Sequence, residues 1–89
     1  MSIYVIRACR AKKGKGRDVQ QLLKKAIENM PSSFVYQSKG DANDFGIFVE
    51  FDGEKAAREF ADSDEQAAIT RQLTSMVEDA TPITVWSRV

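Results

Sequence analysis

Three predicted strands of this chain are apolar on both faces, although the sequence supplies only enough helix to cover one face. These strands span residues 3–10, 45–51 and 83–89. Successive side chains of a strand point to opposite faces, so both faces of the sheet carry apolar residues. A large apolar face is rarely left open to water. In a chain of 89 residues, the expected cover for the second face is another copy, and we therefore expect a homodimer.

The other elements are predicted from hydrophobic spacing and from start and stop signals. A helix is predicted over residues 17–30, ended by Pro31, and a further strand over residues 34–39. Asp52 is expected to cap a short helix after the third strand. Ser63 and Gln66 have the spacing of a capping box at the start of the last helix. That helix is expected to continue to Thr81-Pro82, and its predicted buried stripe is Ile69, Leu73, Met76, Val77 and Ala80.

This order of elements predicts the fold class. Strand, helix, strand, strand, helix and strand follow one another without a linker or repeat. The pattern is typical of an α+β, ferredoxin-like βαββαβ domain, in which a four-stranded antiparallel sheet has its helices on one face. At this length, residues 1–89 form a single domain.

Alternation assigns the side chains of the strands to two faces. One set is apolar apart from Arg7 and is expected to meet the helices: Ile3, Val5, Arg7, Cys9, Phe45, Ile47, Val49, Phe51, Ile83 and Val85. The other set is mixed and includes three aromatic rings. Aromatic residues with scattered charges suit a protein interface, and the expected dimer contacts are Tyr4, Ile6, Phe48 and Trp86.

Composition excludes several classes of function. The 13 Lys and Arg residues equal the 13 Asp and Glu residues, so no net charge favours nucleic acid. No apolar run approaches the roughly 20 residues of a membrane span, and we expect a cytoplasmic protein without a membrane partner. The chain has no histidine and one cysteine. These counts argue against a metal site and exclude nucleophile systems that need histidine.

The layout resembles the antibiotic biosynthesis monooxygenase (ABM) family of dimeric α/β barrel proteins. The resemblance covers essentially the whole chain and rests on three segments, which are Lys13-Gly14, Phe45–Phe51 followed by Asp52–Ala56, and Phe60–Ser63. It implies a homodimer of two face-to-face sheets, with a pocket between the sheet and the helices of each subunit. The haem-degrading branch has Asn, Trp and His where this chain has Arg7, Phe60 and Thr70, so its chemistry is not expected here.

The resemblance to the remaining branches implies a cofactor-independent monooxygenase that acts on a small aromatic or quinol-like molecule. Arg7 would then stabilise developing negative charge, with Tyr36, Thr70 and Gln66 as positioning groups. Phe51, Phe60 and Cys9 are further candidates for the pocket. Each residue also has a structural interpretation, since Arg7 could reach solvent or pair with a helix carboxylate, and the aromatic residues and Cys9 could simply pack in the core.

Two other functions fit the same order of elements. A barrel dimer could bind a small hydrophobic metabolite without catalysis. The RNA-recognition motif shares the topology, and Phe48-Val49-Glu50-Phe51 fits the end of its third-strand element. The residues before Phe48 are out of register with that element, and the hairpin tip at 40–44 is acidic, which is unfavourable for phosphate.

Overall fold

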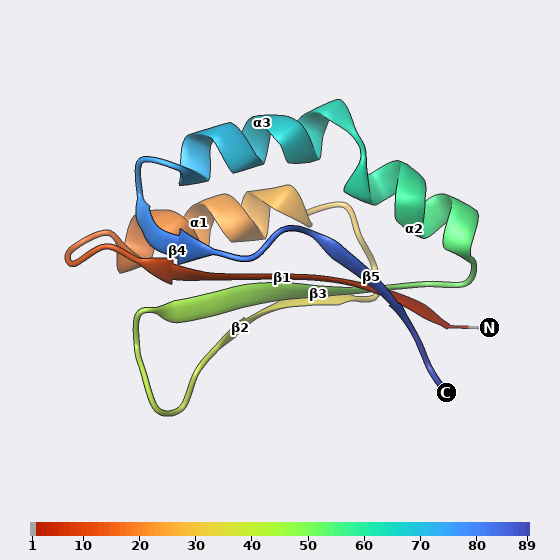
Figure 1. Cartoon of the computed structure of the whole chain (residues 1–89), viewed down its shortest axis with the longest axis horizontal. Coiled ribbons are helices and arrows are strands. Elements are labelled where there is room, and N and C mark those ends of the chain that lie inside the picture. Colours follow the sequence, from red (N-terminus) through yellow and green to blue (C-terminus); the bar gives the residue numbers. More distant parts are fainter. Residues whose placement is uncertain (1) are drawn as a thin grey trace.

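The computed structural model describes residues 2–89 and shows three helices on one side of an antiparallel sheet (Figure 1). The α+β prediction is confirmed, with five strands in place of four. The elements are β1 (Ile3–Ala11), α1 (Gly16–Ala26), β2 (Ser33–Gln37), β3 (Asp44–Phe51), α2 (Glu54–Ala61), α3 (Asp64–Leu73), β4 (Val77–Ala80) and β5 (Thr84–Ser87). None of the helices within this range is long and apolar enough to cross a membrane.

The sheet has the order β2-β3-β1-β4, and β5 also pairs with β1. β4 and β5 therefore share one edge of β1, β4 near its end and β5 near its beginning. Cys9 pairs with Ala80 of β4, whereas Ile6 pairs with Thr84 of β5. Between these two pairs the chain leaves the regular strand pairing, so the edge of β1 is interrupted opposite Arg7, although Thr81 still hydrogen-bonds to Ala8.

The core lies between the sheet and the helices, on the sheet face that alternation predicts. Val5, Ile47 and Val49 are fully enclosed there. Val19 and Leu23 of α1 pack onto them, and α3 adds two further apolar side chains, Ile69 and Leu73. Burying such side chains contributes about 1.5–3 kcal/mol each, so this single layer of contacts accounts for the helices lying on one face.

The last predicted helix is shorter than expected. α3 ends at Leu73, and the chain turns through a hydrogen bond from Met76 N–H to the Leu73 carbonyl. The next residues form β4, so the predicted helical stripe at Met76, Val77 and Ala80 was wrong. Pairing with the free edge of β1 satisfies backbone groups that would otherwise lack partners. The free energy gained from this long-range pairing outweighs the preference for helix that the spacing of apolar residues indicates.

Other boundaries also differ from the predictions. α1 ends at Ala26 and not near Pro31, because the backbone tightens into turns in which Ile27 N–H bonds to Lys24 O. The residue that caps α2 is Gly53, with no side-chain cap, so the predicted Asp52 cap was wrong. The predicted cap at Ser63 is confirmed, since its Oγ accepts from Gln66 N–H at 3.2 Å.

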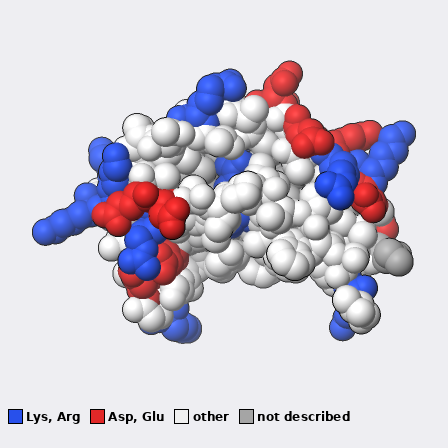
Figure 2. All heavy atoms as spheres, in the orientation of Figure 1, with Lys and Arg blue, Asp and Glu red and all other residues white. Residues whose placement is uncertain are grey.

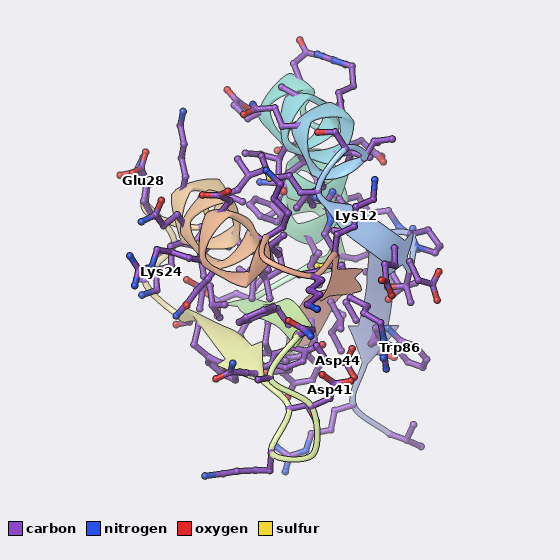
Figure 3. All side chains as sticks on the ribbon, turned by 90° about the vertical axis from the view of Figure 1, so that its left-hand side faces the viewer. Lys12, Lys24, Glu28, Asp41, Asp44 and Trp86 are labelled. Atoms are coloured by element: carbon purple, nitrogen blue, oxygen red, sulfur yellow. The ribbon has the colours of Figure 1, made fainter. Side chains whose placement is uncertain are left out.

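The sheet face opposite the helices carries an aromatic row. The Phe48 ring lies 5.1 Å from Tyr4 on one side and 5.1 Å from Phe34 on the other. Phe34 and Trp86 are 53% and 56% exposed, and Figure 3 shows Trp86 on the sheet side, away from Lys24 and Glu28. The expected apolar second face is therefore present in the single chain, and Phe34 is a member that sequence alternation missed.

Candidate functional site

Arg7 is buried beneath α3 without a carboxylate partner. It points from the centre of β1 toward the helices and is 3% exposed. Neither structural interpretation of this residue holds, because it does not reach solvent and makes no salt bridge with any side chain of residues 2–89. Burial lowers the pKa of the guanidinium, and nearby Cys9 opposes this shift. An unpaired buried cation is costly, so this position requires an explanation.

Two residues one turn apart on α3 hold the Arg7 side chain. Its Nη2 donates to Thr70 Oγ1 at 2.7 Å and weakly to the Gln66 carbonyl at 3.5 Å. The Thr70 hydroxyl donates in turn to the same Gln66 carbonyl, at 2.9 Å. Three residues singled out from the sequence are thus brought together, since Arg7, Gln66 and Thr70 form one hydrogen-bonded cluster.

Two buried polar atoms in this cluster lack partners among the described residues. They are Arg7 Nη1 and Gln66 Oε1. The Gln66 amide nitrogen is used, because it donates to the Ala26 carbonyl at the end of α1. It does not reach back to Ser63, so only half of the predicted capping box forms. Buried donors and acceptors are nearly always satisfied in proteins, by protein atoms or by ordered water, so these two atoms call for a further partner, which is a water molecule or a ligand.

The cluster borders a small cavity at the interrupted edge of β1. The cavity has a volume of about 100 Å³, and its lining residues are Arg7, Thr70, Leu73, Thr74, Val77, Ala80, Thr81, Pro82 and Ile83. Arg7 is the only charged group among them, and the rest are aliphatic or hydroxyl side chains. In Figure 2 the charged residues gather toward the two ends of the molecule, and blue Lys or Arg atoms lie recessed in the uncharged centre.

Thr81 fixes the segment that forms the wall of this cavity. Its backbone N–H donates to the Ala8 carbonyl at 2.9 Å, and its Oγ1 accepts from the Ala8 N–H at 3.0 Å. The next residue is Pro82, which has no N–H to continue a strand. Thr81-Pro82 is therefore a break between two edge strands and not the helix stop that the sequence suggested.

Tyr36 lies on the opposite face of the sheet from Arg7. It pairs with Gly46, and its ring covers this glycine so closely that a Cβ there would lie 2.2 Å from Tyr36 Cζ. Burial raises the pKa of the Tyr36 phenol, with Cys9 adding to the shift. The structure therefore separates Tyr36 from the Arg7 cluster. It lines a hollow of about 310 Å³ on the open sheet face, beside Ala8 and Thr81.

The remaining sequence candidates are also dispersed. Cys9 shares the Arg7 face but lies buried beyond the cluster, and burial raises the pKa of its thiol, against the effect of Arg7. Phe51 and Phe60 contact each other with ring centroids 5.4 Å apart. Phe60 and Gln66 line a third hollow, a groove of about 440 Å³ between α1 and α3, whose apolar floor also includes Ala26, Met30 and Ile69.

Arg10 is the charged residue of β1 that has partners. It pairs with Asp41 at 3.0 Å and with Asp44 at 3.1 Å, and Figure 3 shows these two carboxylates side by side. The contrast with Arg7 is informative, because the chain supplies counter-charges to the exposed arginine and none to the buried one. No group of three His, Cys, Asp or Glu side chains among residues 2–89 could hold a metal ion.

The fold is similar to that of several solved structures, whereas no protein family and no curated protein matches the sequence. A conserved protein from Methanosarcina mazei superposes with a TM-score of 0.81 at 20% identity, over 100% of this chain and 94% of its own. A provisionally named antibiotic biosynthesis monooxygenase from Deinococcus radiodurans gives 0.82 at 16% identity, over 98% and 92%.

A third structure is described as dimeric. This ferredoxin-like protein of unknown function from Bacteroides fragilis gives a TM-score of 0.71 at 16% identity, over 98% of this chain and 96% of its own. At such identities the likeness establishes the ferredoxin-like fold and nothing finer. The predicted fold class is therefore confirmed.

Proposed function

We propose that this protein is an ABM-like, cofactor-independent monooxygenase whose substrate is a small aromatic or quinol-like molecule. The observation that carries the proposal is Arg7, a buried cation with no counter-ion in the described chain and with one unsatisfied nitrogen. A positive charge held in a fixed position stabilises negative charge that develops beside it during a reaction. Thr70 and the Gln66 carbonyl hold the guanidinium in place for that purpose.

The proposed reaction needs only the substrate and dioxygen. An acidic carbon beside a carbonyl or phenolic oxygen loses a proton to solvent water, because the cavity lining holds no base, and the negative charge spreads onto that oxygen. The carbanion transfers electrons to dioxygen, a carbon–oxygen bond forms, and loss of water leaves a carbonyl. A CH2 group and O2 thus become C=O and H2O. Within this scheme Arg7 acts as the catalytic residue that stabilises the oxyanion, and Thr70 positions it.

The shape of the cavity agrees with a substrate that enters only in part. About 100 Å³ at Arg7 is well below the roughly 300–1,000 Å³ of sites that enclose a whole ligand. The oxyanion would enter, and an aromatic body would lie along the apolar rim at Val77, Pro82 and Ile83. Tyr36 and Cys9 have no role in this arrangement, because they line a hollow on the other side of the Thr81 segment.

We further propose that the protein is a homodimer through the aromatic sheet face. The exposed rings of Phe34 and Trp86, together with Tyr4 and Phe48, form a surface suited to a protein interface. The dimeric Bacteroides fragilis structure of similar fold supports this assembly. Light scattering should give twice the chain mass, and Trp86→Glu should shift the mass toward the monomer, whereas Lys55→Glu on α2 should not.

Oxygen uptake with a panel of quinols and enolisable aromatic ketones tests the enzyme proposal. Arg7→Leu should abolish any turnover found, and Arg58→Leu on the exposed face of α2 should leave it unchanged. Unchanged activity in Arg7→Leu would remove this residue from the mechanism. Absence of oxygen uptake across the panel would leave the enzyme proposal without support.

A second candidate function is non-catalytic binding of a small hydrophobic metabolite. The groove between α1 and α3 favours it, since about 440 Å³ with an apolar floor at Met30, Phe60 and Ile69 falls in the size range of ligand sites. Fluorescent apolar dyes would bind there without oxygen consumption. Substituting Phe60→Glu should release the dye if this groove is the site, and should leave the Arg7 cavity unaffected.

A further inference from the structure

We infer that the cavity at Arg7 is a binding site for a compact monovalent anion, with room for a carboxylate group but not for an aromatic ring. The inference deepens the proposed function, because it names the chemical group that this site recognises. Only the identity of the natural ligand rests on the proposed function, because binding of an anion can be measured without turnover.

The charge of the site is the first argument. Arg7 is 97% removed from solvent, and all other residues that line the cavity are uncharged. Within residues 2–89 its guanidinium has hydroxyl and carbonyl partners only, which orient a cation without neutralising it. A desolvated positive charge is stabilised most by one negative charge at short range, and a divalent anion would leave one of its charges without a counter-charge.

The hydrogen-bonding groups are the second argument. Nη1 of Arg7 is a buried donor without a partner among the described residues. A guanidinium presents donors in a planar fork that matches the two oxygens of a carboxylate. The hydroxyl protons of Thr70, Thr74 and Thr81 are already donated to backbone carbonyls, so the guanidinium is the donor that this cavity offers to an anion. The cavity wall contributes no carboxylate that would repel the ligand.

The size of the cavity is the third argument. A cavity of about 150 Å³ is large enough to bind benzene, so a cavity of about 100 Å³ has room for a few heavy atoms and not for a whole ring. Formate or acetate fits this space, whereas the ring of benzoate does not. Benzoate can bind only if its carboxylate enters and its ring lies along the rim at Pro82 and Ile83. A comparison of these anions therefore reports whether the site takes a free small anion or the head group of a larger acid.

Thermal unfolding at constant ionic strength tests the inference. Sodium formate, acetate and benzoate are each titrated against sodium chloride, with sodium sulfate as the divalent comparison. At a concentration about five times the dissociation constant, the bound anion should raise Tm by about 4–8 °C. A Tm shift with formate but not with benzoate would indicate that the site takes a free small anion. A Tm shift with both formate and benzoate would indicate that it takes the head group of a larger acid. Both results support the site.

Two variants locate the effect. Arg7→Met should eliminate the Tm shift with formate, and the matched control Arg58→Met, an exposed arginine on α2, should keep it. Ala80→Leu places a larger side chain at the cavity wall on an exposed strand position and should also eliminate the shift while Arg7 remains. This second variant keeps the test decisive if Arg7→Met does not fold.

The inference is overturned if no compact anion shifts Tm beyond chloride, or if the shift survives in both Arg7→Met and Ala80→Leu. These outcomes are separate from those of the enzyme proposal. Formate binding without oxygen uptake would reject the monooxygenase and leave the anion site in place. Turnover that requires Arg7 but is insensitive to formate would reject the anion site and leave the monooxygenase proposal in place.

Discussion

Replacing Arg7 with methionine should make the protein more stable while it removes the function of the site. Methionine follows the same path through the core but carries no charge, and the position is 3% exposed. The variant loses the 2.7 Å hydrogen bond to Thr70, which is worth about 1.5–3 kcal/mol as a charge-assisted bond. It also loses the penalty of a buried cation without a counter-ion, which is several kcal/mol. The balance is a gain of about 1–3 kcal/mol in the free energy of unfolding.

Urea unfolding at fixed protein concentration measures this gain as a higher midpoint with an unchanged slope. The control is Arg58→Met, which removes an exposed arginine paired with Glu54 at 3.2 Å. Such a surface pair is worth little, so the free energy of unfolding of this control should change by less than about 0.5 kcal/mol. A loss of more than about 1 kcal/mol in Arg7→Met would show that the arginine is a structural support, and the argument from its unmet charge would then fail.

Three further predictions concern the rest of the fold. Gly46→Ala should lower the free energy of unfolding by about 2–3 kcal/mol, because the added Cβ would lie 2.2 Å from Tyr36 Cζ; urea unfolding measures the loss. Ser63→Ala should cost about 1 kcal/mol, because it removes the acceptor for Gln66 N–H, and helix content by circular dichroism should melt earlier. Stability should also fall as pH rises above about 9.0, the ordinary pKa of a thiol, because burial raises the pKa of Cys9 in the folded state. Urea midpoints across this pH range should show a shallower decline in Cys9→Ala.

Each of these predictions has a matched control. Gly40→Ala meets only an ordinary contact 3.8 Å away and should leave the urea midpoint nearly unchanged. Asp52→Ala should cost less than Ser63→Ala, since Asp52 caps no helix. The pKa of the Tyr36 phenol is also raised, so this group adds to the loss of stability at alkaline pH. Measuring Tyr36→Phe gives the size of that contribution. Equal losses of unfolding free energy in Gly46→Ala and Gly40→Ala, or in Ser63→Ala and Asp52→Ala, would contradict the assigned structural causes. An alkaline loss of stability that is unaffected by Cys9→Ala would contradict the role given to the thiol.

The buried face of the sheet and the Arg7 cluster could be predicted from the sequence. Alternation along β1 placed Arg7 among apolar residues, and one helical turn separates Gln66 from Thr70. These are local patterns, so they can be recognised in the sequence without knowledge of the tertiary structure. What they could not show is the absence of a carboxylate near Arg7, because that depends on which side chains of distant elements arrive there.

β2 and β4 were the elements that sequence patterns described poorly. Phe34, Val35 and Tyr36 are all apolar or aromatic, so alternation alone cannot tell which of them faces the helices. Only pairing with β3 decides it, and that pairing places Val35 with the core and Tyr36 opposite. β4 follows a helix without a glycine or proline between them, and it forms because the edge of β1 is free. Both outcomes depend on contacts between segments far apart in the chain.

The interruption between β4 and β5 also determines how a ligand would enter and leave. The opening at Arg7 is formed by backbone that departs from the sheet at Thr81 and returns at Thr84. Helices can therefore stay closed on the core while a small solute exchanges through the margin of the sheet. Thr81 holds this backbone through three hydrogen bonds to Ala8, so hydrogen exchange at the Thr81 N–H should report local opening of the segment and not the global unfolding of the domain.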